Sequence, residues 1–426
     1  MIADNKITTK GLVVWFVCAF FFMYEFLLRT VLGTFQFPLM QDLHLTPVSF
    51  ALLSSTAYQL IYGTMQLPVG IITDRFGLKK TLLAAVLFCA AANLGFAFST
   101  EFSTAAVFRV LMGFGSSFGF VCLLVAVYDW MPRKNIALFI GISQFIGTLG
   151  PMLAAGPFNV LSQNNAVSWR SIFIVLSGIG FLIALLVLFF VEKNRQNQGK
   201  FIILSRPSAI GSNLLRIICQ RQTWFVALYS ACVYFSIEYL SENEGVEFLV
   251  KKGFSSTLSS YMITLAWLGY AVGCPLLGFL SDQFQRRKPV MVVSSLCALF
   301  ALVGIIYLPL GRFATSTCFV FLGIGASGQS IGFAAMAEQC REDYLAVGLA
   351  FNNAIIMLLA AINAPVIGWI LARLAHIYPM RFANYQLGFL VMIGLVTAAM
   401  VLAATAIKET FCKSARENTL LHPKEY

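Results

Sequence analysis

The sequence predicts an all-α integral membrane protein of twelve transmembrane helices, arranged as two similar six-helix bundles. Three observations support this prediction. The chain is 59% hydrophobic and only 11% charged, whereas a soluble domain carries about 25% charged residues. It contains twelve apolar runs long enough to cross a bilayer, which takes roughly 20 residues. A loop sequence from the first half of the chain returns, altered, in the second half.

The repeated loop relates the two halves. Gly70-Ile-Ile-Thr-Asp-Arg-Phe-Gly-Leu-Lys-Lys80 is followed 208 residues later by Gly278-Phe-Leu-Ser-Asp-Gln-Phe-Gln-Arg-Arg-Lys288. Each copy places an Asp four residues after a Gly and ahead of a group of cations. Repetition at half the chain length indicates a tandem duplication. In a membrane protein, two such halves most often form a transporter with its site between them.

The twelve apolar runs give the expected helices. They span residues 11–34, 47–72, 78–98, 102–130, 136–160, 168–191, 222–249, 256–281, 289–309, 313–338, 345–374 and 385–408. The units predicted are an N-terminal bundle over 1–191, a basic connector over 192–221, a C-terminal bundle over 222–408 and a tail over 409–426. The connector is either a plain tether or an amphipathic helix on the anionic inner leaflet.

The loops and the rarer residue types exclude several classes of protein. Lys and Arg gather in alternate loops and in the connector, so both termini are expected in the cytoplasm and no face suits nucleic acid. The ten scattered cysteines contain no CxxC pair, which predicts neither a metal site nor a disulfide framework. No phosphate-binding GxxxxGKS or GxxxxGKT occurs, which excludes ATP-driven pumping by this chain alone. We expect no enzyme activity and no cofactor.

The two loop copies resemble the loop motif of the major facilitator superfamily, found between helices 2 and 3 and between helices 8 and 9. Further matches are Arg109-Val-Leu-Met-Gly113-Phe-Gly115, Asp129-Trp-Met-Pro-Arg-Lys134, Glu338-Gln-Cys-Arg341 and Trp169-Arg170. The second loop copy departs from the motif at Gln285, where Gly is expected. The resemblance covers nearly the whole chain and implies secondary transport by alternating access, by a protein expected to be monomeric.

A second resemblance, to a smaller group within this superfamily, concerns the solute that is transported. Tyr24-Glu25-Phe-Leu-Leu-Arg29 and Met65-Gln-Leu-Pro-Val-Gly70 are similar to segments of the phagosomal nutrient transporters of intracellular bacteria. The segment after Arg29 departs from the Ser-Pro-Ser run of that group. The resemblance implies proton-coupled import of a small polar nutrient, such as an amino acid, across a bacterial inner membrane. The alternatives are import of a carboxylate siderophore, export of a drug or metabolite, and a non-transporting sensor.

The resemblance implies that the loop motifs gate transport and do not bind the solute. The matching residues are Gly70, Asp74, Arg75, Gly77, Asp129, Arg133, Asp282, Arg286, Glu338 and Arg341. We expect Asp74 to cap a helix N-terminus, where a negative charge is favourable by roughly 0.3–1 kcal/mol. Arg75 or Arg133 is expected to pair with it.

Helix 1 carries two charges inside its apolar run. A charge inside a membrane helix costs roughly 2.5–3.5 kcal/mol on insertion scales, so each requires a reason. Glu25 and Arg29 are one helical turn apart and can neutralise each other. Alternatively, Arg29 faces the central cavity and receives an anionic group of the solute, because its planar fork donates two parallel hydrogen bonds.

Helix 7 carries four acids within ten residues: Glu238, Glu242, Glu244 and Glu247. Gly245 favours a helix break among them. Helices 1 and 7 are equivalent in the repeat, and an offset of 209 residues places Arg29 opposite Glu238. The two charges are expected to bridge the cavity or to divide a zwitterion between them. Glu244 and Glu247 are expected at a solvated outer helix end.

Proton coupling is expected to use carboxylates, because no His lies inside an apolar run and burial favours the neutral acid. Glu25 and Glu238 are the candidates, and sodium is the alternative coupling ion. The resemblance implies that Arg109 modulates a nearby acid, and the alternative is an Arg that reaches the membrane interface.

Other polar side chains complete the expected solute site. Together with Arg29, Glu238 and Glu242, the residues expected to bind the solute are Tyr58, Gln59, Tyr62, Gln144, Tyr261, Gln329, Asn352 and Asn353. Each is either a solute contact or a hydrogen bond between helices. Tyr234, Trp267 and Tyr270 are expected on the wall of the second half, or simply in its packing.

Overall fold

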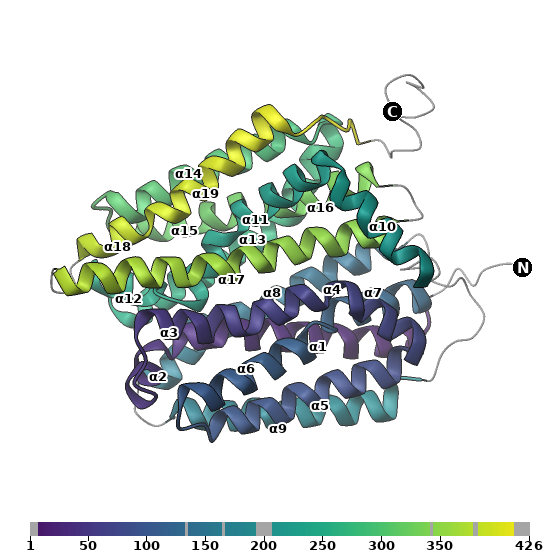
Figure 1. The fold of residues 1–426 in the computed structure, drawn as a ribbon, viewed down its shortest axis with the longest axis horizontal. Coiled ribbons are helices and arrows are strands. Elements are labelled where there is room, and N and C mark those ends of the chain that lie inside the picture. The colour runs from purple at the N-terminus through teal and green to yellow at the C-terminus, as the bar shows by residue number, and fades with distance from the viewer. Residues whose placement is uncertain are drawn as a thin grey trace, which may run out of the picture.

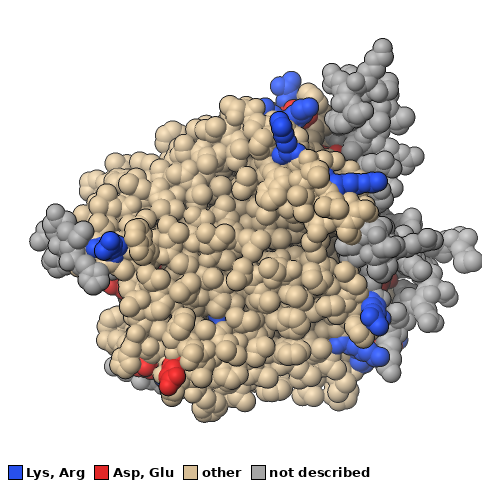
Figure 2. All heavy atoms as spheres, in the orientation of Figure 1, with Lys and Arg blue, Asp and Glu red and all other residues tan. Residues whose placement is uncertain are grey.

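The computed structural model describes residues 7–132, 135–163, 167–192, 207–340, 344–377 and 382–412, where every regular element is a helix. Figure 1 shows the two halves side by side, with both ends of the described chain at one end of the molecule, here called the near end. The far end carries α2 (Gln36–Asp42), α12 (Gly245–Lys251) and α18 (Phe382–Gly388). Figure 2 shows a broad face almost without charged side chains between the two ends. This apolar band suits the hydrocarbon core of a bilayer.

The N-terminal half contains six helical spans. They are α1 (Thr9–Thr34), α3 to α4 (Pro47–Ala51, Ala57–Phe76), α5 (Leu78–Ala97), α6 to α7 (Phe102–Ser116, Gly119–Trp130), α8 (Ile136–Gln163) and α9 (Trp169–Phe190). A π-helical turn, η1 (Leu52–Thr56), separates α3 from α4. Long apolar runs become helices because a bilayer offers no partners for backbone polar groups. Polar side chains cap the first turns of some helices. At the start of α1, for example, Thr8 accepts a hydrogen bond from the amide of Gly11.

The C-terminal half repeats this arrangement. Its spans are α11 to α12 (Arg221–Glu242, then Gly245–Lys251), α13 (Ser256–Phe284), α14 (Lys288–Tyr307), α15 to α16 (Arg312–Ala326, Gly328–Gln339), α17 (Leu345–Ile377) and α18 to α19 (Phe382–Gly388, Leu390–Val401) with η3 (Leu402–Ala406). Eleven of the described spans are long and apolar enough to cross a membrane. The other, over 47–76, contains the π turn. The predicted twelve-helix fold is confirmed, with ends shifted by a few residues.

Between the halves, the described part of the connector forms α10 (Pro207–Cys219). It buries Ile217 and exposes the apolar side chains of Leu215 and Ile218, and its place on the inner leaflet stays a prediction. Trp224 of α11 donates its indole N–H to the carbonyl of Ile218 over 2.9 Å. This contact holds the end of α10 against the C-terminal half. Residues 193–206 lie outside the described residues.

The two halves approach each other closely where α1 passes α11. A side chain added at Gly33 would place its Cβ 2.0 Å from the carbonyl oxygen of Ser241. Only Gly allows the two backbones to approach in this way. The contact lies toward the far end, one turn beyond Arg29 on α1.

The repeated loops turn differently in the two halves. Gly77 has φ 79° and ψ 157°, a conformation essentially restricted to Gly. Gln285 occupies the same place in the second copy with φ 54° and ψ 34°, the left-handed helical region that other residues can enter at a cost. The departure from the motif at Gln285 is therefore accommodated by a different turn.

Candidate functional site

Arg29 lies at the interface between the halves and is 2% exposed. Its Nε atom is 3.4 Å from Oε1 of Glu238 and 3.6 Å from Oε1 of Glu242, both on α11. Its Nη2 atom donates to the hydroxyl of Tyr234 over 2.8 Å, and its guanidinium carbon lies 3.9 Å from the ring centre of Phe26. We call these five residues the Arg29 cluster. It joins α1 of one half to α11 of the other.

Glu25 is held apart from this cluster. Its Oε2 atom accepts a hydrogen bond from the hydroxyl of Tyr58 over 3.3 Å. A Cβ added at Gly119 would lie 2.8 Å from its side chain, so Glu25 is enclosed by α1, α4 and α7 of the N-terminal half. Among the described ion pairs, Arg29 contacts Glu238 and Glu242 and not Glu25. The alternative of a pair within helix 1 is wrong.

Glu242 belongs both to the Arg29 cluster and to the contact between α11 and η1. Its second oxygen, Oε2, accepts hydrogen bonds from Ser55 Oγ over 3.0 Å and from Gln59 Nε2 over 2.7 Å. The helix ends at this residue, because Asn243 has φ −131° and ψ −127°. The predicted break is present, and α12 begins at Gly245.

The break itself binds the opposite half. The side chain of Asn243 accepts a hydrogen bond from Ser54 over 2.6 Å and donates one to Ser55 over 3.0 Å. Glu244 accepts a hydrogen bond from Gln36 over 2.5 Å and is 2% exposed. The expectation of a solvated helix end is therefore wrong for Glu244, because α2 covers it. Glu247 is half-buried.

Arg109 is completely buried. Its guanidinium donates to four backbone carbonyls over 2.6–3.3 Å, those of Leu28, Arg29, Leu53 and Ser54. It also lies 4.4 Å from the ring centre of Tyr58. The π turn makes two of these carbonyls available, since its hydrogen-bond pattern departs from that of an α-helix. The expected alternative of an interfacial Arg is wrong, because Arg109 fastens α1 to η1 beside the Arg29 cluster.

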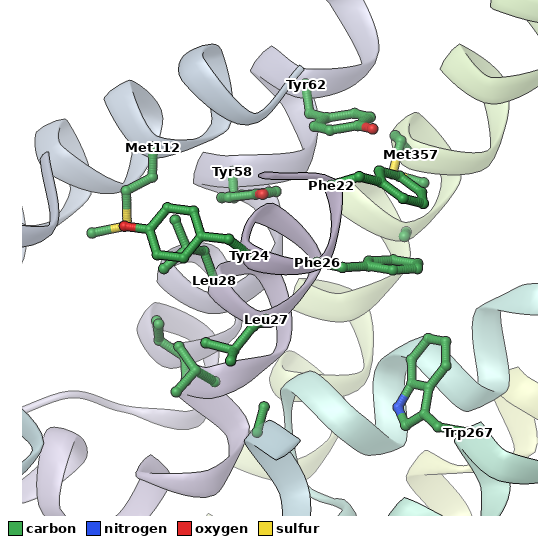
Figure 3. Packing of buried hydrophobic residues seen from close by; sticks show 14 of the residues in the cluster. Phe22, Tyr24, Phe26, Leu27, Leu28, Tyr58, Tyr62, Met112, Trp267 and Met357 are labelled. Carbon is green, nitrogen blue, oxygen red and sulfur yellow. The ribbon is translucent and has the colours of Figure 1, made fainter. Parts of the chain in front are cut away.

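Aromatic side chains form a wall beside Arg29. The ring centres of Tyr234, Trp267 and Tyr270 lie 5.6–6.2 Å from one another, and that of Phe26 lies 5.6 Å from Trp267. We call these four residues the aromatic wall. Figure 3 shows Phe26 and Trp267 directed, with Met357 of α17, toward the same space between the helices. Trp267 donates to Ser241 over 2.7 Å and Tyr270 to Gln329 over 2.6 Å, which fixes the two rings.

The other residues that the sequence predicts to contact the solute have the following surroundings. Tyr62 stacks on Tyr58 with ring centres 6.1 Å apart, and Asn353 donates to Gln66 over 2.8 Å. Asn352 is fully buried, and neither polar atom of its side chain has a hydrogen-bond partner in the described structure. Two further predicted residues have no described hydrogen bond to the Arg29 cluster: half-buried Gln144, and Tyr261, which is 43% exposed and packs on Gly156.

The second-half loop motif forms an ion-pair network at the near end. Arg287 contacts Asp282 over 2.7 Å and Glu338 over 2.6 Å, whereas the sequence singled out Arg286. Partial burial lowers the pKa of Arg287, but hydrogen bonds to Glu338 and Asp282 raise it above its ordinary value. Arg287 therefore stays charged.

The first-half motif is only partly described. Gly70 is buried, Arg75 is exposed and Asp129 is half-buried. The side chain of Asp74, and all of Arg133 and Arg341, lie outside the described residues. The expected pairing of Asp74 stays a prediction.

The chain belongs to the Major Facilitator Superfamily, because the profile of that family matches residues 14–242 and 245–419. The match is interrupted at the break in α11. The chain is thus a multi-pass membrane transporter of a solute and not an enzyme.

Curated relatives include transporters of organic acids. A probable sulfoacetate transporter of Cupriavidus necator is 24% identical over 66% of this chain and 67% of its own length. A hexuronate transporter of Bacillus subtilis is 22% identical over 62% of this chain and 64% of its own length.

Among solved structures, the chain is similar to a bacterial homologue of the human lysosomal transporter Spinster in an inward-facing, unoccupied conformation. The TM-score is 0.74 at 18% identity, over 95% of this chain and 97% of that one. At this identity the likeness supports the fold alone.

Proposed function

We propose that this transporter imports a small polar metabolite bearing a carboxylate, together with protons, by alternating access. The observation that carries the proposal is the buried ion pair of Arg29 with Glu238 and Glu242 across the two halves. The Arg fork matches a carboxylate, so a solute carboxylate competes with the two Glu residues for Arg29. The similarity to transporters named for sulfoacetate and hexuronate supports an organic acid.

Proton coupling is supported by an excess of buried acids. Four carboxylates and two guanidinium groups are buried near the interface of the halves: Glu25, Glu238, Glu242, Glu244, Arg29 and Arg109. Burying an unpaired charge is costly, so the excess acids bind protons when Arg29 turns to the solute. Glu238 and Glu25 are the proposed carriers, and sodium is the alternative ion.

The pattern of contacts between the halves supports alternating access. The described hydrogen bonds that join the halves toward the far end include Gln36 to Glu244, Ser54 to Asn243, and Ser256 to Asn159. We infer that this conformation is closed at the far end. With the near end in the cytoplasm, as the basic loops favour, closure at the far end precedes release of an imported solute.

Uptake by proteoliposomes tests the proposal. A thermal-shift screen of metabolites on the purified protein first selects solutes, because binding to the native state raises apparent stability. The selected solutes are then added to vesicles with a pH-sensitive dye inside. We expect each solute to acidify the interior under an inward proton gradient, with or without sodium. Glu238→Gln and Glu25→Gln should each weaken the acidification, and Arg29→Ala should abolish it.

The exposed Arg312→Ala serves as the matched control and should behave as the native protein. Uptake that ignores both the pH gradient and a protonophore would overturn proton coupling. Retention of full proton-driven accumulation by both Glu variants would overturn the residue assignment alone. Solute that leaves vesicles under the same gradient would reverse the direction.

A further inference from the structure

We propose that the solute carries a cationic amine as well as a carboxylate, and that Glu238 and the aromatic wall receive that amine. The inference rests on the proposed role of Arg29 as the carboxylate receptor. It narrows the solute to zwitterions such as amino acids and their N-substituted derivatives.

The first reason is the chemistry of the space that the Arg29 guanidinium fills. The group lies over the ring of Phe26, donates a hydrogen bond to the hydroxyl oxygen of Tyr234, and faces two carboxylates of α11. Acids and aromatic faces are the partners that bind organic cations. The protein's own Arg29 thus occupies a cation-binding space contributed mainly by the opposite half.

The second reason is the unequal support of the two carboxylates. Glu242 retains hydrogen bonds from Ser55 and Gln59 when Arg29 moves away. Glu238 is 1% exposed, and in the described structure neither of its carboxylate oxygens has a hydrogen-bond partner. When the solute carboxylate takes Arg29, Glu238 is left as a buried charge without a partner, which is costly. An amine on the solute replaces the lost cation directly, in place of the proton that Glu238 would otherwise bind, and leaves Glu25 as the proton carrier.

The third reason is the charge balance of the exchange. A zwitterion binds Arg29 through its carboxylate and Glu238 through its amine, so the net charge of the buried site is unchanged. A simple organic anion instead adds one negative charge to a region where buried acids already outnumber buried guanidinium groups. Such an anion requires an additional proton for each solute.

The aromatic wall is placed to complete the amine site. Tyr234 lies one helical turn before Glu238, so both side chains share one face of α11. Trp267 and Tyr270 pack against Tyr234 with ring centres 6.2 and 5.6 Å away. Their polar atoms are already bonded to Ser241 and Gln329. The rings therefore contribute their faces, which attract ammonium groups.

Binding of matched solutes tests the inference. The probes are the twenty amino acids, N-methylated derivatives including betaine, the corresponding 2-hydroxy acids and the amino acid amides. Thermal shift selects binders and calorimetry measures their affinities. We expect at least one zwitterion to bind ten-fold or more tightly than its 2-hydroxy acid, which keeps the carboxylate and lacks the amine. Glu238→Gln should remove this preference, whereas Glu101→Gln, an exposed carboxylate variant, should retain it.

The outcomes separate this inference from the proposed function. If 2-hydroxy acids bind as tightly as amino acids and lose binding in Arg29→Ala, the carboxylate receptor stands and the amine site is wrong. Equal binding of amides and acids overturns the carboxylate receptor itself. If no zwitterion of the panel binds, the inference fails. Should Glu238→Gln not fold, Glu238→Asp must weaken the preference for the amine.

Discussion

At the scale of single residues, Arg29 is the side chain whose geometry a substitution tests most directly. Its guanidinium meets Tyr234, Glu238 and Glu242 at once, and a Lys ammonium cannot reproduce this planar fork. We expect Arg29→Lys to weaken solute binding at least ten-fold, or about 1.4 kcal/mol, and Arg29→Ala to abolish it. Calorimetry on purified protein measures both. A folded Arg29→Ala protein with native affinity would show that Arg29 has only a structural role.

We expect Arg109 to contribute mainly to the stability of the folded protein and less directly to transport. Its four carbonyl partners are buried between α1 and η1, and each acceptor left without a donor costs about 1–3 kcal/mol. Arg109→Gln should therefore lower the temperature of thermal unfolding in detergent by many degrees. Arg109→Lys, with fewer donors, should recover part of the loss. Arg312→Ala provides the exposed control, and an Arg109→Gln variant as stable as the native protein would refute the assignment.

At the scale of elements, the break between α11 and α12 is the contact that must open at the far end. Ser54 and Asn243 are joined there by a 2.6 Å hydrogen bond. In a background without native cysteines, a short thiol crosslinker between Ser54→Cys and Asn243→Cys should block transport. Reduction of the crosslinker should restore it, and each single variant treated alike should remain active. Full transport by the crosslinked protein would exclude opening at this contact.

At the scale of the whole molecule, the near-end loop networks are expected to set the rate of the conformational cycle. Glu338→Gln removes one charge that Arg287 binds, and Asp74→Asn removes a charge from the loop motif of the first half. Both variants should alter the transport rate and leave equilibrium solute affinity within several-fold, because the loops lie far from the Arg29 cluster. Comparing uptake rates with calorimetric affinities checks this expectation. Loss of binding by folded protein would place these loops in the solute site.

Several features of the site could be predicted from the sequence because the repeat fixes depth along the helices. The offset of 209 residues placed Arg29 opposite Glu238, and the two are 3.4 Å apart. Gly245 indicated the break in α11. Ser55 and Asn243 were missed, although the polar pair Ser54-Ser55 inside an apolar run was a usable signal.

Other features depend on rotation and packing, which no single sequence specifies. Arg29 had Glu25 one turn away on its own helix, yet α11 approaches so closely at Gly33 that its acids become the partners. Glu244 is buried because α2 folds over it. At the near end, the left-handed turn at Gln285 brings Arg287, and not Arg286, against Glu338.

The sequence by itself determined the membrane class, the twelve helices, the duplication and the matching depth of Arg29 and Glu238. A bilayer forces these outcomes, because it requires long apolar helices and makes every buried charge conspicuous. Only the tertiary structure decided which charges meet across the halves and which are enclosed within one. These pairings depend on distances of a few ångströms between helices, which side-chain packing fixes and the order of residues does not.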